Sequence, residues 1–223
     1  MILVTGAAGV LGQAVVKRLS KDGVAVAAVD FQATIPPVGQ TLSIGGVDLA
    51  DCDACSKMMQ VLETAGINAL HGLVNVAGGF VWEKIANGSW QSWERMYRIN
   101  VQSAHHAIVH ALPMLRVGHG AIVNIGAASA ARADGGMGAY TASKSAVARL
   151  TESLAAEETM YGVRVNAILP SIIDTPKNRA DIPDGDFSKW VSPAEIAEVV
   201  AFLISQSASG VTGASIPVFG RVV

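Results

Sequence analysis

A strand, a glycine-rich turn and a helix follow one another at the start of the chain, and this order restricts the fold more than any other feature. Ile2–Thr5 is a short apolar run of the kind found in buried parallel strands. The turn that follows is Gly6-Ala7-Ala8-Gly9-Val10-Leu11-Gly12. Its glycines let the backbone bend tightly and approach a ligand closely, and the next helix presents free N–H groups to an anion. The stretch therefore predicts a dinucleotide-binding turn.

Strands and helices alternate along the rest of the chain. Further strands are expected at 24–29, 41–47, from 71 onward, and at 121–126, 163–169 and 213–219, with helices at 56–65, 90–115, 140–161 and 192–205. Ser192-Pro193-Ala194-Glu195 is a typical helix start, with serine as N-cap and glutamate three residues later. The alternation predicts a single α/β domain over residues 1–223, a Rossmann fold with a doubly wound seven-stranded parallel sheet flanked by helices.

Composition excludes several classes of partner. The 223 residues are 51% hydrophobic and 15% charged, which favours a closely packed globular domain over disorder. A formal charge of −2 gives no electrostatic basis for binding nucleic acid or an anionic membrane. The first strand begins at Ile2, which leaves no room for a targeting peptide, so we expect a cytoplasmic protein without a membrane span.

Cysteine and histidine spacing does not predict a metal site. Cys52 and Cys55 form a CxxC pair, but no second ligand pair is visible, and they are expected in the first turn of a helix. His106 and His110 have helical i, i+4 spacing without a carboxylate to complete a site. We expect ordinary helix positions and no bound metal.

Acidic residues and glycines follow three of the expected strands. Asp30 ends the second strand, where a carboxylate can accept hydrogen bonds from ribose hydroxyls and would repel a 2′-phosphate. This favours NAD(H) over NADP(H), although it does not exclude the phosphorylated form. Asp48 ends the third strand and is a candidate for the adenine edge. The fourth strand runs into Asn75-Val76-Ala77-Gly78-Gly79, where a ligand can approach the backbone.

Tyr140 and Lys144 are four residues apart and so share one face of the expected helix. An ammonium roughly 4 Å from a phenolate is worth about 4 kcal/mol at an effective dielectric near 20, before any cost of desolvation. Such a neighbour lowers a phenol pKa, which makes Tyr140 a candidate general acid/base. Asn100 lies in the middle of the expected 90–115 helix, where asparagine is unfavourable, so it is either a functional or a solvent-facing residue.

The segment 170–190 has no strong periodicity and lies inside an otherwise compact domain. Loops of this length are usually functional, so we expect a lid over the site.

Over nearly its whole length the chain resembles the short-chain dehydrogenase/reductase family, in Thr5-Gly6…Gly12, Asp30, Asn75 to Gly78, Asn100, Tyr140-x-x-x-Lys144 and Pro170…Thr175. The resemblance implies an NAD(P)-dependent oxidoreductase with Tyr140 as acid/base and Lys144 on the nicotinamide ribose. It also implies that the backbone of Asn100 holds a water of a proton relay. The cofactor-binding residues it implies are Gly6, Ala8, Gly9, Val10, Leu11, Gly12, Asp30, Asp48, Leu49, Asn75, Ala77, Gly78, Tyr140, Lys144, Pro170, Ile172, Ile173 and Thr175.

The chain departs from the family pattern at two places. The middle glycine of the turn is Gly9 rather than residue 10, a spacing that other branches of the family use. The family also usually has a substrate-binding serine thirteen residues before the tyrosine, and this position is Ala127. Ser129 is a possible replacement, although in an extended chain it would lie roughly 6–7 Å further along.

The dihydropteridine reductase branch of the family also lacks this serine, and its lid is similar to 169–190 here. The shared lid residues are Leu169-Pro170, Asp174-Thr175-Pro176, Asn178-Arg179, Pro183, Asp186-Phe187-Ser188 and Trp190. This local resemblance implies a quinonoid imine substrate; the broader reading is a small carbonyl or alcohol. The substrate side is then expected to include Gly79, Ala127, Ser129, Tyr140 and Trp190.

Two functions remain open from the sequence. The first is hydride transfer between nicotinamide and a small-molecule substrate. The second, suggested by the missing serine, is a non-catalytic dinucleotide-binding sensor or scaffold. The long 90–115 and 140–161 helices carry more apolar surface than one sheet face needs, so a homodimer or homotetramer is expected.

Overall fold

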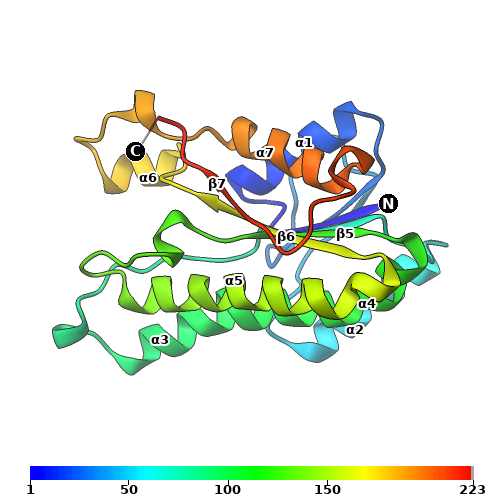
Figure 1. The fold of residues 1–223 in the computed structure, drawn as a ribbon, viewed down its shortest axis with the longest axis horizontal. Helices are drawn as coiled ribbons and strands as arrows, with labels where there is room; N and C mark the ends of the chain where they lie inside the picture. Colours follow the sequence, from blue (N-terminus) through cyan, green and yellow to red (C-terminus); the bar gives the residue numbers. More distant parts are fainter. Residues whose placement is uncertain (222–223) are drawn as a thin grey trace.

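The computed structural model describes residues 1–221, which form a seven-stranded parallel sheet between two layers of helices (Figure 1). The strands are β1 (Ile2–Thr5), β2 (Val26–Val29), β3 (Leu42–Ile44), β4 (Gly72–Asn75), β5 (Ala121–Ile125), β6 (Arg164–Pro170) and β7 (Ser215–Val218). β1, β2, β4 and β5 are buried throughout, as expected for strands covered on both faces. The predicted fold class is therefore confirmed.

Helices α1 (Val10–Lys21) and α7 (Pro193–Ile204) pack together on one face of the sheet (Figure 1). Helices α2 (Cys52–Thr64), α4 (Ser103–Gly118) and α5 (Gly138–Glu158) cover the other face. Each face has its own hydrophobic core, because side chains alternate along every strand: Leu3 belongs to one core, Ile2 and Val4 to the other.

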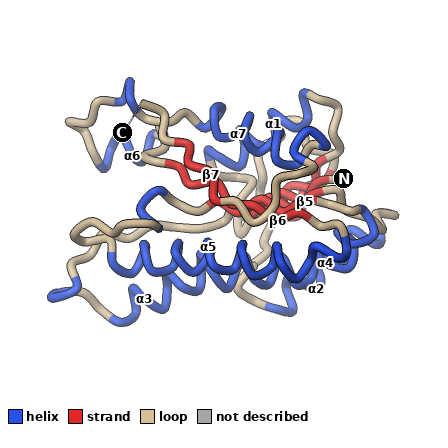
Figure 2. The backbone as a smooth tube through the Cα atoms, viewed as in Figure 1, coloured by secondary structure: helices blue, strands red, loops and turns tan. Residues whose placement is uncertain are grey.

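The strand order is β3-β2-β1-β4-β5-β6-β7, so successive strands are added on one side of β1 up to β3 and on its other side from β4 onward. Figure 2 shows the strands in red between the two layers of helices. Because all strands are parallel, their carboxyl ends share one edge, and open α/β sheets bind ligands where the strand order reverses. The glycine turn after β1 and the segment after β4 both lie at this point.

Several expected strands are shorter in the structure. The strand predicted at 41–47 ends at Ile44, because Gly45 and Gly46 turn the chain: Gly46 has φ +74°, and a Cβ on Gly45 would lie 2.1 Å from the Ala33 carbonyl oxygen. The strand predicted at 24–29 begins only at Val26, and the one at 213–219 narrows to Ser215–Val218.

The helix predicted at 90–115 is interrupted by a wide turn. It consists of α3 (Trp90–Tyr97), a π-helical turn (Arg98–Gln102) and α4 (Ser103–Gly118). Such i→i+5 turns inside α-helices are frequent at functional sites. The helix start at Ser192 is confirmed as a capping box, in which the Ser192 and Glu195 side chains each bond the other's backbone N–H.

A buried chain of polar side chains links the sheet centre to α5. Asn75 Nδ2 donates to Asn124 Oδ1 at 2.9 Å, and Asn124 Nδ2 donates to Thr151 Oγ1 at 2.9 Å. Thr151 in turn donates to the Val147 carbonyl at 2.9 Å. The Asn75 side chain, on β4, therefore points into the core, where its Nδ2 is bonded while its Oδ1 has no partner within residues 1–221.

Within residues 1–221, no helix is both long and apolar enough to cross a bilayer.

Candidate active site

Close backbone packing explains the glycine turn after β1. Gly6 has φ +64°, a conformation that favours glycine, and a Cβ on it would lie 2.7 Å from the Ala77 backbone nitrogen. A Cβ on Gly12 would lie 2.1 Å from the Gly6 carbonyl oxygen. The turn is thus pressed against the segment after β4, at the reversal point of the sheet.

The first turn of α1 is suited to a phosphate. Its N-cap is Gly9, no side chain of the described residues caps it, and its first turn contains no acidic residue. The N–H groups and the positive end of the helix dipole are therefore left for an anion. The turn fits the pyrophosphate of a dinucleotide.

Asp30 lies directly beside the glycine turn and is 7% exposed. Its Oδ2 accepts from the Ala8 N–H at 2.8 Å, and its Oδ1 accepts from the Gln32 N–H at 2.8 Å. The carboxylate therefore supports the turn while retaining lone pairs for a ribose hydroxyl.

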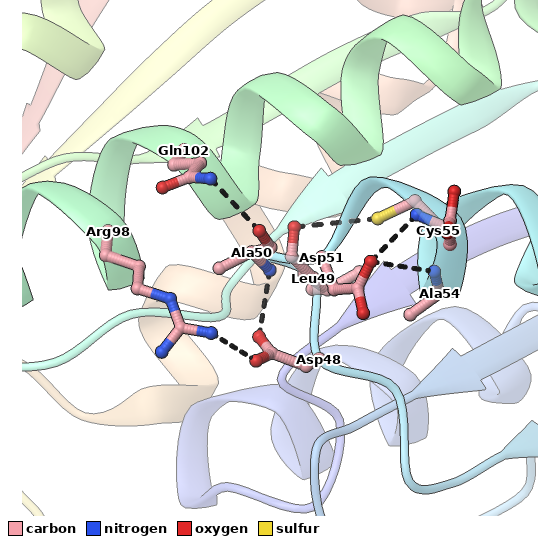
Figure 3. A network of polar contacts seen from close by, with 9 residues as sticks. Asp48, Leu49, Ala50, Asp51, Ala54, Cys55, Arg98 and Gln102 are labelled. Carbon is pink, nitrogen blue, oxygen red and sulfur yellow. Dashed lines mark hydrogen bonds and ion pairs between the residues drawn. The ribbon is translucent and has the colours of Figure 1, made fainter.

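Asp48 follows β3 and belongs to a network that the sequence did not suggest (Figure 3). Its Oδ1 accepts from the Ala50 N–H at 2.9 Å, and its Oδ2 forms an ion pair with Arg98 Nη2 at 2.5 Å. Leu49 is buried beneath this network, with its carbonyl 3.5 Å from the Cys55 thiol. Asp48, the candidate partner of the adenine edge, is thus held by Arg98 of the π-helical turn, 50 residues further along the chain.

The Asn100 side chain forms hydrogen bonds that hold two parts of the site together. The residue is 2% exposed, its Oδ1 accepts from the Gly79 N–H at 2.9 Å, and its Nδ2 lies 3.1 Å from the Gly79 carbonyl and 2.9 Å from Ser143 Oγ. Ser143 Oγ donates to the Tyr140 carbonyl at 2.6 Å. Asn100 therefore connects the end of β4 to the first turns of α5, and the alternative of a solvent-facing asparagine is wrong.

Lys144 is buried beside Asn100. Its Nζ donates to the Ile125 carbonyl at the end of β5, at 2.7 Å. A Cβ on Gly78 would lie 2.6 Å from Asn100 Oδ1 and 3.4 Å from Lys144 Nζ, so both polar groups converge on this glycine. Burial lowers the pKa of Lys144 to about 8, because desolvation penalises the ammonium.

Tyr140 lies on the same helix, and burial raises its pKa to about 12. The expected lowering by Lys144 does not appear in the isolated chain. The Lys144 ammonium donates to Ile125, and desolvation of the phenolate is the dominant effect on Tyr140. Lowering the phenol pKa would therefore require a further positive or hydrogen-bonding group at the site.

The wall facing Tyr140 is mainly apolar. Ala127 is 6% exposed, and Phe80 packs edge-to-face on the Tyr140 ring. Ser129 Oγ is buried and finds no hydrogen-bond partner within residues 1–221. A Cβ on Gly79 would meet the Ile99 side chain at 2.5 Å.

The expected lid contains more structure than predicted. It includes α6 (Pro176–Asp181), capped by Thr175 Oγ1, which accepts from the Asn178 N–H at 3.1 Å. Asn178 Nδ2 also donates to the Ile173 carbonyl at 2.8 Å. Ile173 pairs with Val191 in a parallel bridge that joins the two ends of the lid. Pro170, at the end of β6, is buried, whereas Ile172 is 37% exposed.

Trp190, expected to face the substrate, instead lies inside the lid. The residue is 6% exposed, its ring packs on Phe187 with centroids 4.8 Å apart, and a Cβ on Gly185 would lie 2.6 Å from its indole. Large aromatic side chains gain the most free energy from burial. The polar residues around Trp190 in the sequence gave no sign that the loop would bury it. Arg179 adds to this packing, since its guanidinium lies 4.8 Å from the Phe187 ring centroid.

Both cysteines are thiols near the start of α2, as expected. Cys52 Sγ lies 3.6 Å from His110 Nε2. Burial raises the pKa of the Cys55 thiol to about 11. Among residues 1–221 no group of three or more His, Cys, Asp or Glu side chains is placed to hold a metal ion.

The sequence reasoning missed Phe80, Arg98 and Ser143. Two of these residues could have been found from their spacing. Arg98 lies two residues before Asn100, and Ser143 lies one helical turn after Tyr140. Phe80 follows the glycines after β4 directly, and a large apolar residue at a ligand-binding strand end could have been noted.

Comparison with known proteins agrees with this arrangement. Residues 6–220 match the family model described as Enoyl-(Acyl carrier protein) reductase. The chain is 32% identical to meso-2,3-butanediol dehydrogenase of Serratia marcescens, with 99% of this chain and 93% of that protein covered. It is 34% identical to 4-formylbenzenesulfonate dehydrogenase of Comamonas testosteroni, with coverages of 98% and 95%.

Solved structures give the same result. A short-chain type dehydrogenase/reductase from Mycobacterium ulcerans superposes with a TM-score of 0.89 at 27% identity, covering 99% of this chain and 88% of the other. NAD+-bound xylitol dehydrogenase superposes with a TM-score of 0.88 at 25% identity, with coverages of 98% and 97%. The chain belongs to the short-chain dehydrogenase/reductase family. It is accordingly an NAD(P)-dependent oxidoreductase.

Proposed function

We propose that the protein is an NAD(H)-dependent reductase of a small conjugated carbonyl or imine, with Tyr140 as the acid/base. The observation that carries the proposal is the convergence of Asn100 Oδ1 and Lys144 Nζ on Gly78, one helical turn from Tyr140. A buried lysine whose pKa is lowered by desolvation, next to a buried amide and an exposed glycine, is a pattern that clusters at functional sites.

In this mechanism the nicotinamide, when bound, supplies or accepts a hydride at C4. Tyr140 Oη gives the proton to the substrate heteroatom in reduction, or removes it in oxidation. Lys144, one helical turn from Tyr140, would bind the nicotinamide ribose. Asn100 holds Gly79 and Ser143, so it fixes the position of the strand end relative to α5.

Asp30 supports the preference for NAD(H). A carboxylate that is 7% exposed beside the glycine turn can accept from ribose hydroxyls and would repel a 2′-phosphate. Asp30→Asn keeps an acceptor for Ala8 and removes the charge. We expect it to weaken NADH binding while strengthening NADPH binding relative to NADH, measured by quenching of protein fluorescence. An unchanged ratio of the two dissociation constants would contradict the preference.

Ala127 and Phe80 support a substrate that needs little help from a hydroxyl donor. A quinonoid dihydropterin, the substrate implied by the lid resemblance, is such an electrophile, and its flat ring would fit an aromatic wall. The test is oxidation of NADH, followed by absorbance, with chemically generated quinonoid dihydropterin and with panels of quinones and ketones. Turnover of ketones alone would exclude the pterin version and retain the broader reductase.

Tyr140→Phe tests the acid/base role directly. We expect turnover to fall by at least about a hundredfold, the usual contribution of a positioned general acid, with NADH binding unchanged. Unchanged turnover would show that another group supplies the proton.

A second candidate function is a dinucleotide-binding sensor without catalysis. Ala127 in place of a serine favours it, and the intact arrangement of Asn100, Tyr140 and Lys144 opposes it. Tight NADH binding without turnover of any member of the panel would favour the sensor.

We also propose that the protein is a homodimer or homotetramer joined through the face of α3, α4 and α5. Large apolar side chains remain exposed there, including Tyr97 at 57% and Val109 at 47%. Light scattering coupled to size exclusion tests this, and Val109→Glu is expected to produce monomers.

A further inference from the structure

A thiol and an imidazole meet outside the Tyr140 site, between the first turn of α2 and the middle of α4. Cys52 is exposed, and its Sγ lies 3.6 Å from His110 Nε2. The two residues are 58 positions apart in the chain, so only the fold brings them together. Packing does not account for this cysteine, because the thiol buried in the core is that of Cys55, one turn later. The pair is therefore a candidate reactive centre.

The tautomer of His110 is determined by its own helix. Its Nδ1 lies 2.8 Å from the carbonyl oxygen of His106, one turn earlier. A carbonyl oxygen can only accept a hydrogen bond, so Nδ1 carries the proton of the neutral ring and Nε2 presents its lone pair to the Cys52 sulfur. A nucleophile, a base and a group that orients the base thus follow one another, which is the usual arrangement of an activated thiol.

The groups beside Cys52 on α2 do not activate the thiol. Both sequence neighbours, Asp51 and Asp53, are acidic, and negative charge disfavours a thiolate. Free N–H groups at the start of a helix can stabilise a thiolate. Here Asp51 caps them, because its Oδ1 accepts from the Asp53 N–H at 2.9 Å and from the Ala54 N–H at 3.4 Å (Figure 3). Removal of the thiol proton therefore depends on α4, where His110 faces the sulfur and the ring of His106 packs edge-to-face on His110.

We propose that Cys52 is a covalent modification site, at which the thiol exchanges with a low-molecular-weight disulfide while His110 Nε2 accepts its proton. The Cys52 sulfur attacks one sulfur of the disulfide, and the old S–S bond breaks as the new one forms. The proton passes from Cys52 to His110 and then to the departing thiolate. One disulfide is consumed, one mixed disulfide is formed and one thiol is released. The inference does not depend on the proposed function, because the pair lies outside the Tyr140 site.

The test measures the second-order rate of reaction of the folded protein with 2,2′-dipyridyl disulfide, followed by the absorbance of the released pyridine-2-thione. An ordinary thiol is only a few per cent ionised at pH 7, so the loss of a base is visible there. We expect His110→Gln to react about tenfold more slowly than the wild type at pH 7 and at a similar rate at about pH 10, where a thiol ionises without help. Mass spectrometry of the wild type should place the adduct on Cys52.

His105→Gln is the matched control, since it removes an exposed histidine of the same helix and should keep the wild-type rates. Equal rates of the His110→Gln and wild-type proteins at pH 7 would overturn the inference. A deficit that persists undiminished at pH 10 would also overturn it, because His110 would then affect access to the sulfur and not its proton. An adduct on Cys55 of the folded protein would exclude Cys52 as the site.

Discussion

The ring of Phe80 meets the ring of Tyr140 edge-to-face, with 4.9 Å between centroids and 79° between planes. Phe80 follows β4 and Tyr140 lies in the first turn of α5, so the contact joins the end of β4 to the start of α5. Phe80 is 47% exposed, so about half of its surface remains open to solvent.

Replacing Phe80 by leucine should therefore affect activity more than folding. An aromatic pair contributes about 0.5–1.5 kcal/mol beyond the area it buries, so we expect kcat/KM to fall about 2–10-fold. Steady-state kinetics with an accepted quinone or ketone measure this. Phe202→Leu is the control, since Phe202 is 45% exposed on α7, on the opposite face of the sheet. Equal effects of both changes would exclude a role for the Phe80–Tyr140 contact.

Gly78→Ala should disturb the site, because the neighbouring Asn100 side chain cannot move away from the new methyl group. The new Cβ would lie 2.6 Å from Asn100 Oδ1, and this amide is held by Gly79 and Ser143. We expect a loss of about 1–3 kcal/mol in the free energy of unfolding, typical of overpacking, together with loss of activity. Urea denaturation measures the first.

Gly135→Ala is the matched control for this change. A Cβ at Gly135 meets no atom of the described residues within 4 Å, and its φ is ordinary. Its unfolding free energy should stay within about 0.5 kcal/mol of the wild type. A Gly78→Ala protein as stable and as active as this control would show that Asn100 moves freely.

Lys144→Met should stabilise the protein at neutral pH and lose this advantage as the pH rises. The pKa of Lys144 falls from 10.5 to about 8 on folding, which at pH 7 costs about 3 kcal/mol. Between pH 8 and 10.5 the unfolded chain binds the extra proton, so wild-type stability rises with pH through this window. The methionine variant has no such gain.

Denaturant unfolding of both proteins at pH 7 and pH 10.5 measures the effect, and we expect the difference between them to change by about 3 kcal/mol in favour of the wild type. Lys57→Met, at an exposed position of α2, should show no such change. A difference that does not depend on pH would mean that Lys144 keeps its ordinary pKa in the folded protein.

The two thiols should react very differently. Cys52 is exposed, whereas Cys55 is buried and its pKa is raised to about 11. Because the thiolate is the nucleophile, iodoacetamide at pH 8 should modify one cysteine of the folded chain. Mass spectrometry identifies it, and Cys52→Ser should then remain unmodified until the protein is denatured. Rapid modification of Cys55 in the folded chain would indicate local opening of α2.

The sequence was sufficient for the fold because buried parallel strands are continuous apolar runs with glycine or acidic residues at their ends. Ile2–Thr5 is an example, and the strand expected at 121–126 ends one residue earlier, at Ile125. Gly45 and Gly46 show the limit: their effect on β3 depends on the approach of the Ala33 carbonyl, which no local pattern reveals.

The candidate site was only partly predictable for a related reason. Tyr140, Lys144 and Asn100 were recognisable from type and spacing, but the partners of their side chains come from distant segments. The Arg98–Asp48 pair spans 50 residues, and no residue type or spacing marks the π-helical turn in advance. Burial of Trp190 depends on how the lid folds on itself, and the pKa of Tyr140 depends on the balance between desolvation and charge.

The chain of side chains from Asn75 through Asn124 to Thr151 also bears on how such a protein can change over evolution. Apolar packing alone would let α5 slide or rotate by small amounts as neighbouring residues are exchanged. Directional bonds in a dry interior fix one register, because any displacement leaves buried amides unpaired. Loops at the strand ends can then be lengthened, shortened or rewritten for a new substrate while the phenol of Tyr140 stays at the same depth above the sheet. With α5 fixed by these polar side chains, the position of the catalytic residues can stay constant while the loops that determine the substrate change.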